Sequence, residues 1–201
     1  DIDEKDVFAS VEKHFKNIKN TKEIPSKLHT IEPVQDGEKR VIINKESAVQ
    51  MIAITYHIPN FEHEDQVALS ALSEFLSSGK SSILQKKLVD EKRLVNTIYA
   101  YNMELKDPGI FMFMAVANES VDAKEIEKEI LDTIAQIKKG DISQKDIDKI
   151  KINTKADFIF SLESSTEVAS LYGSFLVREN IEPLLNYEKN VDKLTKEDLI
   201  N

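Results

Sequence analysis

The chain has 201 residues, of which 41% are hydrophobic and 31% are charged, a balance typical of a folded globular protein. Its formal net charge is −9, from 27 basic and 36 acidic residues. Nucleic-acid binding is therefore disfavoured, because a phosphate backbone is bound by clustered Lys and Arg. The absence of Cys excludes disulfides, thiolate nucleophiles and Cys-based zinc sites. No apolar run approaches the roughly 20 residues that cross a bilayer, so we expect a soluble protein with no membrane span.

The chain opens on Asp1-Ile2-Asp3-Glu4, without an initiator Met and without the basic and apolar segments of a signal peptide. We therefore expect it to be cut from a longer protein, whose targeting cannot be read here. At the other end, a helix from Thr195 onward leads to no further element. This predicts that the last domain continues beyond residue 201.

The first predicted element is a helix over residues 4–18. Asp3 is a suitable N-cap, and one face carries Val7, Val11, Phe15 and Ile18. Residues 19–38 are polar, contain two prolines and show no sustained period. A stretch of this length is unusual inside one compact domain, so we interpret it as a linker between two domains.

Two strands, two helices and a hairpin are predicted next. Two β-rich runs cover Arg40–Asn44 and Ala48–His57, and the second has apolar residues on both sides, which predicts a strand packed on both faces. Helices are predicted over Glu64–Ser77 and Ser82–Glu91, separated by Gly79. Runs at Thr97–Leu105 and Ile110–Ala117 flank an Asp-Pro-Gly turn and predict an antiparallel hairpin.

The rest of the chain is predicted to be helical. The expected ranges are 122–138, 143–162, 166–178, 183–191 and 195 onward. Capping-box patterns begin two of them, at Ser143 and Thr195. Strands followed by helices, with an antiparallel hairpin, predict an α+β fold in which helices pack on one face of an antiparallel sheet.

Most catalytic motifs fail on spacing. Gly79-Lys80-Ser81 resembles the end of a phosphate loop, but Glu74 stands where that loop needs its first Gly, and a helix precedes it instead of a strand. His63-Glu64 begins a zinc motif, but Val67 occupies the position of its second His. The inverted motif H-x-x-E-H is absent. We interpret His57 and His63 as surface residues and predict no metal site in this chain.

Two other groups of residues have structural interpretations. The carboxylates at Glu125, Glu127, Glu129 and Asp132 are predicted to form a solvated helix face with Lys partners four residues away. Phe111 and Phe113 are predicted to face the core.

One stretch is more specific. It reads LSEFLSSGKSSIL from Leu72 to Leu84 and KLVDEKRLVN from Lys87 to Asn96. This resembles the second-domain signature of insulinase/pitrilysin-type zinc peptidases, in which a helix ends in L-x-x-G-x-S-S-x-L and the next closes with L-R-E-E-x-G-L-x-Y. The resemblance continues through the turn at Asp107–Gly109 and the helices beyond it, and covers residues 40–201.

The resemblance implies a clamshell of homologous α+β halves enclosing a peptide, with the zinc ligands on the first half. Residues 1–18 then correspond to the last helix of the metal-bearing domain, 19–38 to a linker, and 39–201 to the C-terminal noncatalytic domain. In many members the second half supplies an Arg and a Tyr that reach the substrate carbonyl and the oxyanion. Those positions hold Val89 and Asn96 here, and the family Gly is Arg93. These three are the substrate-facing candidates. Arg93 is either a compensating cation or a solvated helix-end residue.

The implied function is the noncatalytic, substrate-enclosing half of a zinc metalloendopeptidase, with no cofactor in this fragment and zinc in the parent. Its expected partners are the upstream half, a peptide substrate and a second subunit in a homo- or heterodimer. The alternative is an enzyme-dead scaffold or inactive heterodimer partner of the same family. A third reading, an acidic binding module of other ancestry, requires the signature to be coincidence. We expect a bacterial protein of the cytoplasm or periplasm.

Overall fold

The computed structural model describes residues 3–19, 21 and 32–201, which fall into two compact units, one within residues 1–44 and one of residues 45–201. The first unit holds helix α1 (Glu4–Phe15), shorter by one turn than predicted. Asp3 caps it, accepting a hydrogen bond from the Lys5 backbone N–H at 2.8 Å. No side chain of α1 is buried. The predicted linker and domain bounds fall partly outside the described residues and stay predictions.

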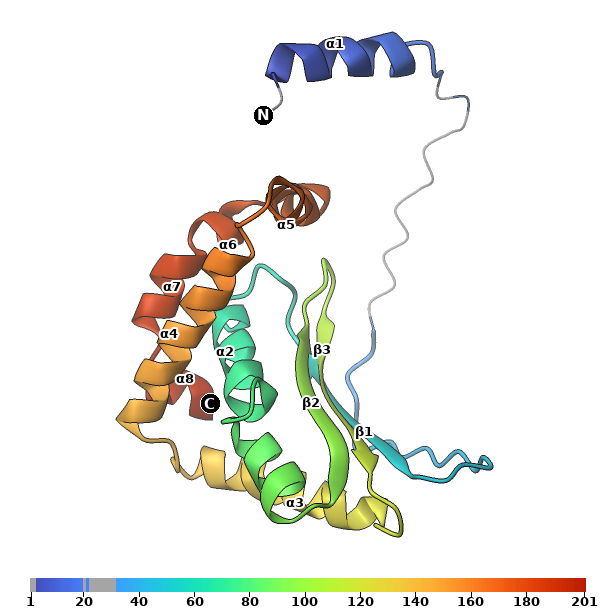
Figure 1. The fold of residues 1–201 in the computed structure, drawn as a ribbon, viewed down its shortest axis with the longest axis vertical. Coiled ribbons are helices and arrows are strands. Elements are labelled where there is room, and N and C mark those ends of the chain that lie inside the picture. Colours follow the sequence, from blue (N-terminus) through green and yellow to red (C-terminus); the bar gives the residue numbers. More distant parts are fainter. Residues whose placement is uncertain (1–2, 20, 22–31) are drawn as a thin grey trace. The chain divides into compact units, whose positions relative to one another are not determined.

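The second unit contains a three-stranded antiparallel sheet (Figure 1). Strands β1 (Met51–Ile58), β2 (Val95–Met103) and β3 (Gly109–Ala117) lie in the order β1-β3-β2. The predicted hairpin is confirmed, since β2 and β3 pair through their lengths. Gly109 is required where the hairpin closes, because a Cβ there would meet the Met103 carbonyl oxygen at 2.1 Å.

Two strand predictions are wrong. Arg40–Asn44 forms no strand, and its apolar side chains are exposed, Val41 to 82%. A β-rich run needs a neighbouring strand to bond with, and local composition does not reveal whether one is present. The next strand begins at Met51 rather than Ala48, and it is packed on one face only.

Seven α-helices and one π-helix occupy the described part of this unit. They are α2 (Gln66–Ser77), the π-helix η1 (Gln85–Glu91), α3 (Ala123–Lys138), α4 (Gln144–Phe160), α5 (Ser165–Val177), α6 (Glu182–Leu185), α7 (Tyr187–Lys193) and α8 (Lys196–Ile200). The capping boxes predicted at Ser143 and Thr195 are both present.

The helices cover one face of the sheet. Helix α2 packs on β2, α3 packs on β1 and β3, and α4 and α7 pack on α2 as an outer layer (Figure 1). The main core lies between the sheet and these helices and includes Ile98, Phe113, Leu76, Leu88 and Ile126. The α+β prediction is therefore confirmed. Helix α2, which precedes the hairpin, shares the covering layer with the later helices.

Candidate functional site

The three candidate residues lie on one continuous segment, the π-helix η1, the turn after it and the start of β2. A helix was predicted here, but not its π-helical hydrogen-bond pattern. The Lys92 backbone N–H reaches back five residues to the Lys87 carbonyl, at 3.0 Å. The next bond spans six residues, from the Leu94 N–H to the Leu88 carbonyl at 2.8 Å. Short π-helical turns of this kind recur at functional sites.

Arg93 occupies the turn in a left-handed conformation, with φ of 52°. Its carbonyl oxygen accepts a hydrogen bond from Nδ2 of Asn118, at 2.7 Å. The Asn118 backbone N–H also donates to the Leu94 carbonyl at 2.9 Å. The turn is thus fixed to the end of β3. A left-handed residue at this point explains why the family pattern has Gly there, since Gly adopts positive φ without steric cost.

Asn96 lies in a bulge of β2. Val95 pairs with Ala117 and Thr97 pairs with Val116, so Asn96 has no direct partner on β3. Its side chain is exposed. A bulge redirects side chains out of the regular alternation, which suits a residue that must reach a ligand.

Val89 differs from the other two candidates. It is half-buried and packs against the main core, whereas Arg93 and Asn96 are exposed. The structure therefore brings Arg93 and Asn96 together at the exposed start of β2. Val89 lies on the preceding helix η1 and faces the core instead. Val89 has no hydrogen-bonding group.

A partly buried ion cluster joins η1 and the residue after it to α3, and the sequence analysis missed it. Glu129 was predicted to lie on a solvated face, yet its side chain is only 11% exposed. It pairs with Lys92 and with Lys87, whose Nζ lies 3.1 Å from Oε2 of Glu129. The hydrogen bond from Lys92, reinforced by Lys87, lowers the pKa of the Glu129 carboxyl below its ordinary value despite partial burial. The neighbouring pair Lys128–Asp132 does follow the predicted spacing.

The side chains of the described residues do not fit a zinc ion. Within the described ranges, no group of three or more His, Asp or Glu side chains is placed to hold a metal. His63 accepts a hydrogen bond from the Asp65 N–H at 3.2 Å, whereas His57 lies on β1. His29 lies outside the described residues. Zinc hydrolysis needs about three protein ligands and an open position for water.

The face of the sheet turned away from the helices is also apolar, and we call it the open face. Register pairs Ala53 with Met114 and Met114 with Tyr99, and the next row joins Thr55, Met112 and Tyr101. Tyr99 and Tyr101 are 55% and 54% exposed. Because alternate residues point to opposite faces, all four methionines of the chain (Met51, Met103, Met112 and Met114) lie on this face.

The family model described as the peptidase M16 inactive domain matches residues 1–154. The chain belongs to the M16 peptidase family. The part of that family that it matches is the inactive domain. The insulinase-like resemblance is thereby confirmed, and so is its assignment to the noncatalytic half. Among the described residues, no helix is long and apolar enough to cross a membrane.

Named relatives agree. The chain is 42% identical to the zinc protease PqqE of Helicobacter pylori over 203 residues, which is all of this chain and 46% of that protein. It is 29% identical to the mitochondrial-processing peptidase subunit beta of Saccharomyces cerevisiae over 110 residues, 53% of this chain and 24% of the yeast protein. The chain thus spans slightly less than half the length of the bacterial relative and about a quarter of the length of the yeast one.

Solved structures carry the same fold. A protease from Helicobacter pylori matches with a TM-score of 0.94 and 41% identity, covering all of this chain and 49% of that one. The peptidase M16 inactive domain from Pseudomonas fluorescens matches with a TM-score of 0.68 and 17% identity, covering 77% and 37%. The second likeness concerns the fold alone.

Proposed function

We propose that this chain is the noncatalytic half of a zinc-dependent metalloendopeptidase and closes a peptide-holding chamber against an upstream half that carries the zinc. The observation that carries the proposal is the open face of the sheet. It is apolar, it belongs to a domain of the M16 inactive type, and no described element of residues 45–201 covers it.

The open face supports pairing with a second domain. Exposed Met and Tyr side chains such as Met51, Tyr99 and Tyr101 are the kinds enriched at protein interfaces. Contiguous apolar surface of this kind marks an interaction site. Covering it with the upstream half would remove that surface from water, which provides the driving force for assembly.

Helix α1 supplies a matching surface in the first unit. Phe8, Val11 and Phe15 of this helix are exposed to 64%, 48% and 61%. Apolar residues on one face of a helix are stable in water only when that face is covered. We assign its cover to the upstream, metal-bearing domain, from which this helix would be the last element.

Within the chamber, Arg93 and Asn96 would face the peptide. Asn96 can donate a hydrogen bond from its amide, but it is shorter than the Tyr of the family pattern. Val89 cannot donate one. Arg93, at the end of the π-helical turn, is the one cation among the three candidates and would take over part of the missing contact with the substrate carbonyl.

A second function, an inactive scaffold or heterodimer partner, is favoured by one observation. Val89, at the position of the family Arg, packs against the core and has no group that could donate a hydrogen bond to a substrate. An oxyanion donor contributes on the order of 3–4 kcal/mol to the barrier, so a chain without the Arg and Tyr contacts would lose much of the rate.

The test is complementation. The upstream half and this chain are expressed separately, and cleavage of a quenched fluorescent peptide is measured for each and for the mixture, with and without a chelator. We expect chelator-sensitive cleavage in the mixture and little in either half alone. Full activity of the upstream half alone would contradict the proposal. A mixture that assembles but does not cleave would instead establish the scaffold function.

A further inference from the structure

A second candidate site lies in the helical layer, on the side of the sheet opposite the open face. A pocket of about 680 Å³ opens between α2, α4 and α7. Its wall carries Glu74 of α2, Thr154, Asp157 and Phe158 of α4, and Tyr187 of α7. None of the signature residues Val89, Arg93 and Asn96 lines it.

The pocket is negatively charged, and two of its carboxylates have no cationic partner. Within residues 32–201, no ion pair joins Glu74 or Asp157 to a Lys or Arg side chain, although Lys189 and Lys193 also lie on the wall. Glu74 accepts only a neutral hydrogen bond, from Nδ2 of Asn153 at 3.2 Å. Partial desolvation, and then the charge of Glu74, raise the pKa of the Asp157 carboxyl.

The acidic surroundings also affect Tyr187 in the pocket wall. Burial, followed by the charges of Glu104, Asp157 and Glu74, raises the pKa of the Tyr187 hydroxyl to about 12. Of these three carboxylates, Glu104 is paired with Arg178, so Glu74 and Asp157 are the two whose charge is not compensated within the described residues. A cation placed beside these two would relieve this repulsion.

Two buried polar atoms in the pocket wall have no hydrogen-bond partner among the protein atoms of the described residues. Oγ1 of Thr154 has none, although Thr154 is only 6% exposed. Oδ1 of Asn102 has none either, while its amide nitrogen donates to Gln66 and Ser70. A buried polar atom without a partner destabilises the protein by about 1–3 kcal/mol, so atoms of this kind are sites that a ligand can satisfy. Both atoms can accept a hydrogen bond from a ligand.

A guanidinium is already held beside this pocket, by residues that also line it. The guanidinium of Arg178 lies 4.4 Å from the ring centre of Phe61 and 4.3 Å from that of Phe175, and its Nη1 lies 2.9 Å from Oε1 of Glu104. The two aromatic rings and the carboxylate therefore hold this guanidinium in place. The pocket wall contains the same components again, with Phe158 and Tyr187 (ring centres 5.0 Å apart) and the carboxylates Asp157 and Glu74, and Phe158 packs against the cluster of Phe61 and Phe175.

We propose that the part of the pocket formed by Phe158, Tyr187, Asp157 and Glu74 binds the guanidinium of an arginine side chain that lies outside the 201 residues of the chain. The planar group would stack on the Phe158–Tyr187 pair and donate to the Asp157 and Glu74 carboxylates and to Thr154 Oγ1. Guanidinium has five donors in one plane and stacks on aromatic rings, so it fits this set of acceptors better than a compact ammonium does. The proposal does not rest on the chamber function, because the pocket lies on the other side of the sheet.

The test uses three probes and NMR on the labelled 201-residue chain. The probes are N-acetyl-arginine methylamide, its lysine analogue and its neutral citrulline analogue. We expect saturable shifts at Thr154, Asp157 and Tyr187 with the arginine probe, weaker binding of the lysine probe and none of the citrulline probe. Equal responses to the arginine and citrulline probes, or shifts spread over the acidic surface without saturation, would overturn the proposal.

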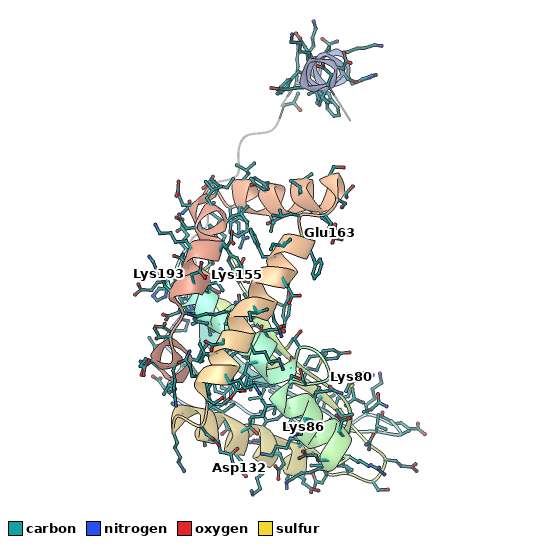
Figure 2. The ribbon with its side chains drawn as sticks, turned by 60° about the vertical axis from the view of Figure 1, so that its left-hand side comes forward. Lys80, Lys86, Asp132, Lys155, Glu163 and Lys193 are labelled. Carbon is teal, nitrogen blue, oxygen red and sulfur yellow. The ribbon has the colours of Figure 1, made fainter. Side chains whose placement is uncertain are left out.

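Two variants separate binding from folding. Asp157→Asn, at the exposed pocket mouth, should weaken the arginine probe about tenfold through loss of a charge-assisted hydrogen bond. Its control is Glu163→Gln, which has the same charge change at the exposed turn after α4, outside the pocket (Figure 2). Thr154→Val should raise the melting temperature of the free chain and weaken the probe. Stabilisation with unchanged binding would contradict the role of Thr154.

The same titration identifies the source of the arginine. If it comes from another part of the longer parent protein, the probe should bind this chain and fail to bind the parent. If it comes from a separate peptide, the probe should bind both equally. Failure to bind either would refute the site, while leaving the complementation result unaffected.

Discussion

The two faces of the sheet are made from the same strands, yet they have different surroundings. On the covered face, Phe113 and Ala115 of β3 are 2% and 0% exposed beneath the helices. On the open face, their neighbours Met112 and Met114 are only half-buried, by the strands beside them. Strand β3 is apolar at every position, a pattern of strands buried on both faces. The comparison indicates that the sequence of β3 is suited to burial of its open face as well. The described residues of 45–201 do not bury that face.

The largest expected effect tests the difference directly. Phe113→Ala should lower the free energy of unfolding of the chain by about 3–5 kcal/mol, because it leaves a cavity under the helices. Met114→Ala, one residue away on the open face, should cost less than about 1 kcal/mol. Urea unfolding followed by circular dichroism measures both. Equal losses would mean that the two faces are equally buried in solution.

The next prediction concerns the assembled protein. The double change Tyr99→Glu and Tyr101→Glu should leave the stability of this chain nearly unchanged and weaken its association with the upstream half at least about tenfold, since charges would then be buried at the interface. Calorimetric titration measures the affinity. Ile152→Glu, at an exposed apolar position on α4 (68%), is the control. Equal weakening by the control would place the interface elsewhere.

The covered side also contains the ion cluster that joins η1 to α3. Glu129→Gln should lower the free energy of unfolding by about 1–2 kcal/mol at neutral pH, because Lys87 and Lys92 lose their partner. The lowered pKa of Glu129 means that its pairs stabilise the fold above the ordinary value of 4.5 and lose that effect as the pH falls through the lowered folded value.

Unfolding measured from pH 7 to pH 3 should therefore show a narrowing gap between the wild-type chain and Glu129→Gln below about pH 4.5, the ordinary Glu value. Asp132→Asn, an exposed carboxylate on the same helix, should show a much smaller gap. A gap that widens on acidification would contradict the sign of the pKa shift.

The smallest expected effect lies at the turn between η1 and β2. Arg93→Gly should raise the free energy of unfolding by up to about 1 kcal/mol, because Gly relieves the left-handed strain at φ of 52°. Arg93→Ala removes the same charge and keeps the strain, so it should not stabilise the chain. Thermal melts of the two variants side by side distinguish backbone strain from charge.

Local chemistry was sufficient to predict much of this fold. The Asp107–Gly109 turn between two β-rich runs predicted the β2–β3 hairpin, and Ser143 and Thr195 predicted two helix starts. These signals act over a few residues. Arg40–Asn44 has the composition of a strand but no partner in the described chain, and pairing depends on residues far away in sequence.

The candidate site was harder to predict. The positions of Val89, Arg93 and Asn96 followed from a resemblance, and their roles remain a prediction. The π-helical winding and the bulge at Asn96 depend on how Leu88, Leu94 and Val95 reach the core. Glu129 looked solvated because its Lys partners come from another helix. The acidic pocket joins residues as distant as Glu74 and Tyr187, and only the folded chain brings them together.

Methionine oxidation tests the central claim, that the open face is covered by the other half, most directly. All four methionines lie on this face. The rate at which hydrogen peroxide converts them to sulfoxides, measured by mass spectrometry, therefore shows whether the face is exposed or covered. We expect Met51, Met112 and Met114 to oxidise readily in this chain and several-fold more slowly in the longer protein or in the mixture of halves. Equal rates in both would contradict the account.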